Sequence, residues 1–251
     1  MREVDPTQPY CVIPARFSST RFPGKPLVPL LGKPMVLWVA EACEQAVGNQ
    51  QVIIATEDRR IFESAATAGF QAAMTSRDAL TGTDRVAEVA AEIGGQTVVN
   101  VQGDEPLVSP EDILKVARVH QENRDYVVNG YTHLSAEEDP HRLTIPKLVL
   151  DQHEQLLYAS RAPIPSSKDP TRVAKSQFLK QVCVYGFSAQ QLEKFSRRGT
   201  KTPLEESEDI EVLRFIELDQ PVKMVKLENR GVAVDEPNDV NRAEVALRNR
   251  T

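Results

Sequence analysis

Short apolar runs alternate with helix-like segments along the first half of the chain, and no other feature constrains the fold as strongly. Four of these runs are typical of buried strands, at residues 10–15, 51–55, 71–74 and 97–101. Strands and helices that alternate about every 20–25 residues predict a parallel sheet with helices on both faces. We therefore expect an α/β fold.

Helix signals fill the segments between these runs. They include stops at Gly48 and Gly69, an expected N-cap at Asp84 for a helix that reaches about Ile93, and an N-cap at Ser109 ahead of Pro110. Each predicted helix thus follows one predicted strand.

The second half of the chain is less regular. Strands are expected at residues 148–150, 156–159, 179–187 and 222–227, with 151–154 as the turn of a hairpin. Helices are expected at 188–197, 203–218 and 240–247, and a mobile loop at 166–176. Since no internal repeat or clear linker occurs, we expect one continuous sheet domain with an inserted hairpin lobe.

The charge balance argues against a dedicated nucleic-acid binder. The 251 residues include 30 Lys and Arg against 36 Asp and Glu, a net charge of −6, whereas such proteins need a basic surface. Positive charge is nevertheless concentrated at one place. Residues 16–33 hold four basic side chains and no acidic one, which makes this stretch +4 and the remainder −10.

The sequence predicts a cytoplasmic protein without membrane insertion. No stretch approaches the roughly 18–20 apolar residues of a membrane-spanning helix, and residues 1–9 are polar rather than signal-like. Cys11, Cys43 and Cys183 show no CxxC spacing, so we expect small buried side chains rather than disulfides or a zinc site.

The basic segment follows the first predicted strand, where parallel sheets bind ligands. Arg16, Arg21 and Lys25 lie there beside Gly24 and the small residues 18–20, an arrangement that suits a polyphosphate. A solvated basic turn is the alternative. Neither GxGxxG nor the Walker A pattern occurs, which disfavours a nicotinamide enzyme.

Carboxylates at two other strand ends suggest a metal site. Asp104 follows the strand at 97–101, and Mg²⁺ prefers one or two carboxylates together with substrate phosphates. Glu105 is an alternative ligand, although it is also a candidate helix cap. Asp235 ends a late apolar run and is the expected second ligand, whereas Asp239 is expected to cap the last helix.

Five segments, in order, resemble the CMP-Kdo synthetases, the 3-deoxy-manno-octulosonate cytidylyltransferases. They are residues 11–35, 74–85, 98–106 (VVNVQGDEP), 158–165 and 232–240 (VAVDEPNDV). The resemblance implies a Rossmann-like, mixed but mostly parallel sheet of the nucleotide-diphospho-sugar transferase type, and a homodimer built partly from the hairpin lobe. It also implies a CTP-binding half at about 9–130, a sugar-binding and dimerisation half at about 131–230, and a metal-binding segment at about 231–251.

The resemblance also implies roles for individual residues. Those expected at the CTP triphosphate are Arg16, Ser19, Arg21 and Lys25. Those expected around cytosine and ribose are Ala15, Thr75, Arg77, Gly82 and Arg85. Gln102 would contact nucleotide and sugar, Asp104 and Asp235 would bind Mg²⁺, and Arg161 and Tyr185 would face the sugar acid. Catalysis would rest on Arg16, Lys25, Asp104 and Asp235.

Arg161 also suits its role on chemical grounds, because an ulosonate carries a carboxylate that an arginine fork can bind. A surface ion pair is the alternative. Lys147 matches a basic residue of the family and is expected to add positive potential, with a solvated strand-end lysine as the alternative.

Two departures from the family pattern fall in the expected sugar pocket. Gln181, Val182 and Cys183 stand where the family has His and small residues, and Val212 follows Glu211 where the family has Gln. The loss of polar groups predicts an altered acceptor, with Gln181 and Glu211 among the sugar contacts. Alternatively, Gln181 replaces the histidine as a donor and Val212 reflects local repacking.

The remaining conspicuous side chains are expected to be structural. His120, His133, His141 and His153 show no metal-ligand spacing and are predicted at the surface. Trp38 is predicted to lie in the core or an interface.

The predicted activity is that of a magnesium-dependent cytidylyltransferase. A sugar-acid hydroxyl would attack the α-phosphate of CTP to give a CMP-sugar and pyrophosphate, for lipopolysaccharide or another surface glycan. The acceptor is Kdo or a variant. Alternatives are another acidic sugar, such as a modified Kdo or a sialic-acid-like nonulosonate, and a non-catalytic nucleotide-binding protein.

Overall fold

A computed structural model describes residues 4–18, 22–169, 173–228, 233–234 and 236–249. A nine-stranded sheet forms its centre, with the strand order β11-β7-β10-β6-β1-β4-β5. Its parallel part contains β1 (Tyr10–Pro14), β4 (Val52–Thr56), β5 (Gln71–Met74) and β6 (Val98–Val101). These are the four strands predicted from the apolar runs, and the mostly parallel α/β sheet is confirmed.

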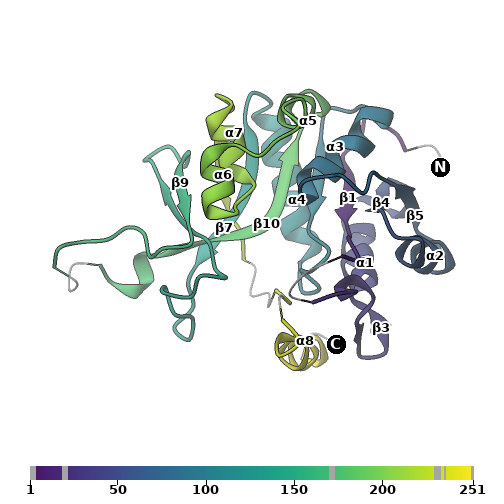
Figure 1. Cartoon of the computed structure of the whole chain (residues 1–251), viewed down its shortest axis with the longest axis horizontal. Helices are drawn as coiled ribbons and strands as arrows, with labels where there is room; N and C mark the ends of the chain where they lie inside the picture. The colour runs from purple at the N-terminus through teal and green to yellow at the C-terminus, as the bar shows by residue number, and fades with distance from the viewer. Residues whose placement is uncertain (1–3, 19–21, 170–172, 229–232, 235, 250–251) are drawn as a thin grey trace.

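The other part of the sheet is mixed. The strand β10 (Leu179–Phe187) runs antiparallel to both β6 and β7 (Val127–His133), whereas β11 (Val222–Lys226) is parallel to β7. Strands β8 (Lys147–Leu150) and β9 (Leu156–Ser160) form the predicted hairpin, which joins the sheet through β10. Figure 1 shows β9 on the side of the molecule opposite to α2.

Helices cover both faces of the sheet. On one face pack α1 (Met35–Val47), α2 (Arg59–Thr67) and α4 (Pro110–Glu122). On the other pack α3 (Gly82–Ile93), α5 (Ala189–Ser196) and α7 (Val212–Glu217), with α6 (Pro203–Glu208) beside α7. This two-sided arrangement is visible in Figure 1 and agrees with the prediction.

The last helix, α8 (Asp239–Arg248), packs with a small separate core that includes Leu30, Met35 and Leu107. Trp38 packs against this core, as predicted. A short ribbon of β2 (Pro29–Leu30) and β3 (Lys33–Pro34) precedes α1, and 3-10 turns occur at Lys25–Leu27, Asn49–Gln51 and Lys175–Gln177. Asp239 is the first residue of α8 rather than its cap, and its carboxylate accepts the N–H of Glu236.

Strand β7 is absent from the strands predicted, because polar Asn129 and Gly130 interrupt its apolar run. Asn129 is fully buried and donates to the carbonyls of Val182 and Val184, at 2.9 and 3.0 Å. These carbonyls lie where the register of β10 shifts against β7. The asparagine therefore satisfies an irregularity of the neighbouring strand.

Two helix predictions were wrong. The segment 203–218 is not one helix, because Asp209 takes a left-handed conformation (φ 51°) that ends α6 before α7 begins. Asp84 is not the cap of α3, since the hydroxyl oxygen of Thr81 accepts the N–H of Asp84. Asp84 instead pairs with buried Arg214.

The four histidines differ in their exposure to solvent. His133, His141 and His153 are exposed as predicted, but His120 is fully buried. Its ring nitrogens lie 3.2 Å from the Thr97 hydroxyl and 3.2 Å from the Gln191 side-chain oxygen. Both nitrogens have polar partners, which explains how this polar ring is accommodated in the core.

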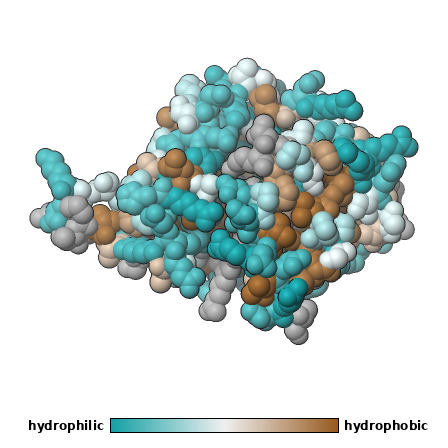
Figure 2. Space-filling view, turned by 60° about the horizontal axis from the view of Figure 1, so that its bottom comes forward, coloured by the Kyte–Doolittle hydropathy of each residue, from teal (hydrophilic) through white to brown (hydrophobic). Residues whose placement is uncertain are grey.

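Cys11 and Cys43 are buried, as predicted, whereas Cys183 is partly exposed. No helix in the described part of the chain is long and apolar enough to cross a membrane. Hydrophilic side chains dominate the face shown in Figure 2, and the hydrophobic ones form separate patches.

Candidate active site

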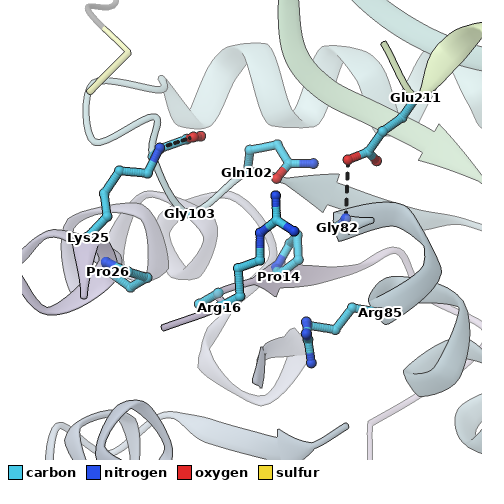
Figure 3. Close-up of a pocket in the computed structure, with 11 residues that line it drawn as sticks. Pro14, Arg16, Lys25, Pro26, Gly82, Arg85, Gln102, Gly103 and Glu211 are labelled. Carbon is cyan, nitrogen blue, oxygen red and sulfur yellow. Dashed lines mark hydrogen bonds and ion pairs between the residues drawn. The ribbon is translucent and has the colours of Figure 1, made fainter. Parts of the chain in front are cut away.

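Two adjoining cavities open where β1 and β6 end. The first cavity is lined by residues from the loops after β1 and β6 and from the start of α3, including Ala15, Arg16, Lys25, Gly82, Arg85 and Gln102. Figure 3 shows Arg16, Lys25, Arg85 and Gln102 among the residues that line this cavity. The second cavity shares Arg16, Gln102, Asp104 and Glu211 with the first. The loops after β1 and β6 and the start of α3 therefore meet at one edge of the sheet.

The basic loop after β1 returns on itself at Gly24. Its N–H donates to the carbonyl of Phe17 at 2.9 Å, and its φ is 72°. A Cβ there would lie 3.1 Å from the Phe17 ring, so glycine allows the close turn that brings Lys25 to the cavity. Arg16 lines both cavities. The predicted phosphate contacts Ser19 and Arg21 lie outside the described residues.

Lys25 and Asp104 form an ion pair at the junction of the cavities. The Lys25 Nζ lies 2.7 Å from Asp104 Oδ2, and their side chains are 16% and 28% exposed. Asp104 is presented by the turn after β6, where Gly103 approaches the end of β1 so closely that a Cβ would lie 3.1 Å from the Pro14 carbonyl. The strand ends thus hold this carboxylate in place.

The opposite side of the first cavity contains a buried arginine. Arg85 forms an ion pair with Glu57 at 3.0 Å and donates to the Thr75 hydroxyl and to the Ser76 carbonyl. Burial lowers the pKa of Arg85, although Glu57 opposes the shift. Arg77, predicted near the base, is exposed and does not line either cavity.

Glu57 was not among the predicted site residues. Its second oxygen accepts the N–H of Phe17 at 2.9 Å, so this carboxylate connects Arg85 to the basic loop. The only signal for it in the sequence was its place directly after the strand predicted at 51–55, since the residues that follow parallel strands lie at one edge of a sheet.

Gly82, Gln102 and Glu211 meet at the N-terminus of α3. A Cβ on Gly82 would lie 2.9 Å from the Gln102 Nε2, so any larger residue there would displace the Gln102 amide. Glu211 accepts the N–H groups of Gly82 (3.1 Å) and Thr83 (2.9 Å), as well as the Thr83 hydroxyl. Burial raises the pKa of Glu211, while these hydrogen bonds oppose the shift.

Alternate residues of β10 line the second cavity. Gln181, Cys183 and Tyr185 all contribute to it, and Gln181 Nε2 donates to Asn129 Oδ1 at 2.9 Å. Burial raises the pKa of Tyr185. Val212 is fully buried in the apolar core and does not line the cavity, which favours the repacking interpretation of that departure.

Arg161 also lines the second cavity, with much of its guanidinium bound to main-chain oxygens. It donates to the carbonyls of Glu208 (2.6 Å), Leu143 (2.9 Å) and Asp209 (2.8 Å). The ion pair weighed as the alternative role exists too, since its guanidinium lies 3.7 Å from the Asp209 carboxylate. Lys147 is fully buried, so the alternative of a solvated lysine was wrong.

Asp104 is a predicted ligand of Mg²⁺, and it lines both cavities where they adjoin. In the described ranges, no three His, Cys, Asp or Glu side chains converge on a metal-sized site. The N–H of Val234 donates to the Asp104 carbonyl at 3.0 Å, which brings the chain beside Asp104 one residue before Asp235. Asp235 itself lies outside the described residues. One or two carboxylates with substrate phosphates are a usual Mg²⁺ environment.

Comparisons with known proteins identify the family. The cytidylyltransferase family profile matches residues 10–224. The 3-deoxy-manno-octulosonate cytidylyltransferase of Solibacter usitatus is 39% identical over 236 residues, which cover 92% of this chain and 91% of that protein. That of Bdellovibrio bacteriovorus is 35% identical over 238 residues, covering 94% and 96%. The chain belongs to the 3-deoxy-manno-octulosonate cytidylyltransferase family.

One solved structure agrees with membership of this cytidylyltransferase family, and a second shows the same fold. CMP:2-keto-3-deoxy-manno-octonic acid synthetase complexed with CTP superposes with a TM-score of 0.87 at 29% identity, over 98% of this chain and 100% of that one. A cytidylyltransferase from Leptospira borgpetersenii, with a TM-score of 0.62 and 14% identity over 97% and 87%, shares the fold.

Proposed function

We propose that this protein transfers CMP from CTP to the anomeric hydroxyl of a 3-deoxy-2-ulosonic acid, which is 3-deoxy-manno-octulosonate or a variant, and releases pyrophosphate. The observation that carries the proposal is the pair of cavities sharing Arg16, Gln102, Asp104 and Glu211. A nucleotide in the first cavity and an acid in the second would adjoin at these residues. The relatives from Solibacter usitatus and Bdellovibrio bacteriovorus are named for the same activity, which supports the proposal.

The reaction forms a bond from the anomeric oxygen to the α-phosphorus and breaks the bond from that phosphorus to the bridging oxygen of the β-phosphate. The hydroxyl proton is lost, and pyrophosphate leaves. Such transfers depend mainly on positioning and charge stabilisation. Arg16 and Lys25 would bind the triphosphate, with Ser19 and Arg21 of the same loop. Residues Ala15, Thr75, Gly82 and Arg85 would surround the cytidine, whereas Arg77, also expected there, lines neither cavity.

Asp104 and Asp235 would hold Mg²⁺. When bound, the cation neutralises phosphate charge and favours departure of pyrophosphate. Lys25 already balances the charge of Asp104, at 2.7 Å. The lysine would therefore remain beside the triphosphate when the carboxylate engages the cation.

In the second cavity, Arg161 would bind the acceptor carboxylate, while Gln102, Gln181, Tyr185 and Glu211 contact its hydroxyl groups. We assign the altered acceptor preference to Gln181 and Cys183, since Val212 has no exposed surface. Gln181→His should then change the relative rates with different ulosonic acids. An unchanged ranking of acids would contradict this assignment.

A homodimer is part of the proposal, with the β8–β9 hairpin at the interface. Leu157 on β9 is 57% exposed and Leu143 is 64% exposed, which leaves apolar surface on this lobe for a partner. Sedimentation equilibrium should give twice the chain mass; a monomer would contradict the proposed dimer. We also propose that the chain divides into a nucleotide half, a sugar half and a metal-binding terminal segment. Its proposed location is the cytoplasm, where it would serve surface-glycan synthesis.

Asp104→Asn tests the proposed centre. It removes one charge at the cavity junction, so pyrophosphate release should fall by about 100-fold or more, as when a preorganised charge contact is lost. The free energy of unfolding should change by about 1 kcal/mol or less, because the pair is partly exposed. Asp125→Asn, at an exposed aspartate, is the matched control. Near-normal turnover of Asp104→Asn would remove the metal assignment.

A further inference from the structure

Lys147, the first residue of β8, is a charged side chain with none of its surface exposed. Its ammonium group donates to three main-chain carbonyls, those of Arg142 (3.0 Å), Ile145 (2.7 Å) and Arg161. A lysine ammonium has three N–H donors, so these carbonyls account for all of them. Burial lowers the pKa of Lys147. A buried cation is costly unless its hydrogen bonds are complete, as they are here.

The three carbonyls come from two segments that both border the second cavity. Arg142 and Ile145 enclose a turn in which the Ile145 N–H also donates to the Arg142 carbonyl, at 3.2 Å. Thr144 and Pro146 from this segment line the cavity. Arg161 directly follows β9, and the last residue of that strand, Ser160, pairs with Lys147 in the β8–β9 ladder. Lys147 therefore joins the segment before the hairpin to the segment after it.

The side chain of Arg161 continues the connection. It donates to the carbonyl of Leu143, which lies between the two carbonyls of the same turn that Lys147 binds. Its other donors reach the carbonyls of Glu208 and Asp209, at the break between α6 and α7. Asp209 lines the second cavity as well. Two cations therefore hold three backbone segments around this cavity.

We propose that Lys147 is a positioning residue for the acceptor. It fixes the main chain of Arg161 and the turn at 142–145, so that the Arg161 guanidinium and the edge at Thr144 and Pro146 keep their places in the second cavity. The inference rests on the proposed function of that cavity. None of the three residues that Lys147 contacts through hydrogen bonds lines the first cavity, so the nucleotide should be unaffected.

Lys147→Met removes the ammonium group while keeping an unbranched side chain. Pyrophosphate release with CTP and 3-deoxy-manno-octulosonate should show a KM for the acid raised by about tenfold or more, because small displacements of positioning groups are costly. The KM for CTP should change by less than about twofold. A residue that merely stabilises the fold would not separate the two substrates in this way.

A double-variant comparison tests whether Lys147 acts through Arg161. Arg161→Met should raise the KM for the acid by itself. If Lys147 serves to place Arg161, adding Lys147→Met should increase that KM by less than about twofold, since coupled residues are not additive. Independent, multiplied effects would overturn the proposed connection.

Lys115→Met is the matched control, because Lys115 also donates to a main-chain carbonyl, that of Lys226 at 2.7 Å, but lines neither cavity. It should leave both KM values unchanged. If Lys147→Met does not fold, Lys147→Gln retains two N–H donors and should show the same selectivity for the acid. Equal changes in both KM values, or no change, would overturn the inference. A wild-type protein that releases no pyrophosphate would contradict the proposed function instead.

Discussion

The Glu57 carboxylate connects the basic loop of the first cavity to the arginine on its far side. It accepts the N–H of Phe17 and pairs with Arg85, whose side chain is only 4% exposed. Glu57→Gln keeps the shape but removes the charge opposite Arg85. A charge-assisted contact contributes about 1.5–3 kcal/mol, so we expect the KM for CTP to rise by about tenfold or more.

Steady-state kinetics with varied CTP would measure this effect. Glu63→Gln is the matched control, because Glu63 pairs with Arg59 on the exposed surface of α2. The KM for the acid should change little in either variant. A Glu57→Gln protein with an unchanged KM for CTP would show that the Glu57–Arg85 pair does not support nucleotide binding.

Single residues were predictable where chemistry and position in the chain coincided. Lys25 and Asp104 were both expected near the ends of strands, and both line the first cavity, although their ion pair at 2.7 Å was not predicted. Glu57 was missed because a carboxylate in a polar turn carries no motif. The burial of Lys147 was also unpredictable, because its three carbonyl partners belong to backbone whose conformation the sequence pattern does not reveal.

Arg214 connects its own helix to three others through one buried guanidinium. It contacts Asp84 of α3 at 2.7 Å and Glu205 of α6 at 2.5 Å, and its own helix is α7. The guanidinium also lies 3.8 Å from the centre of the Phe195 ring in α5. These contacts hold the break between α6 and α7, from which Glu211 reaches the first cavity.

Arg214→Met should therefore be strongly destabilising, since it leaves two carboxylates buried without their cation. We expect the free energy of unfolding to fall by about 3–5 kcal/mol and the Tm by roughly 10 °C, measured by denaturant and thermal unfolding. Arg197→Met, on the exposed pair with Glu193, should cost about 1 kcal/mol or less. A comparable loss in both variants would contradict this role.

Elements with a regular pattern were predicted well, and irregular ones were not. The apolar runs of β1, β4, β5 and β6 have no competing signal. The segment 203–218 is helical on local grounds, but Asp209 breaks it because Arg161 binds the carbonyls of Glu208 and Asp209. Strand β7 was missed because a polar Asn129 does not fit the pattern of a buried strand. Its burial depends on hydrogen bonds to carbonyls of β10, which the sequence does not reveal.

At the scale of the whole molecule, His120 makes stability depend on pH. Burial lowers its pKa, while the hydrogen bond to the Gln191 side-chain oxygen opposes the shift and Arg124 adds to it. The unfolded chain, with a histidine pKa of about 6.5, therefore binds the proton more readily than the folded one. The free energy of unfolding should fall as the pH drops below about 6.5, by at most about 1.4 kcal/mol per pH unit from this group.

Urea unfolding at several pH values between about 5 and 7, the range in which histidine titrates, would measure how the free energy of unfolding changes with pH. His120→Gln should be less stable at neutral pH but should lose less stability on acidification. His141→Gln, at an exposed histidine, should retain the wild-type slope. An undiminished slope in His120→Gln would contradict the role of the buried ring.

The overall architecture was the most predictable level. Alternating strands and helices require a covered, mostly parallel sheet, and parallel strands bring their following loops to one edge. The net charge of −6 carried little information by itself. Its uneven distribution was more informative, because the +4 segment at residues 16–33 supplies Arg16 and Lys25 to the first cavity.

Pyrophosphate release from the four nucleoside triphosphates, each paired with a panel of ulosonic acids and Mg²⁺, tests the central claim most directly. The account predicts release that requires CTP and a 3-deoxy-2-ulosonic acid together, with 3-deoxy-manno-octulosonate or a variant as the preferred acid. Release with another triphosphate in preference to CTP, or no release with any acid of the panel, would contradict it.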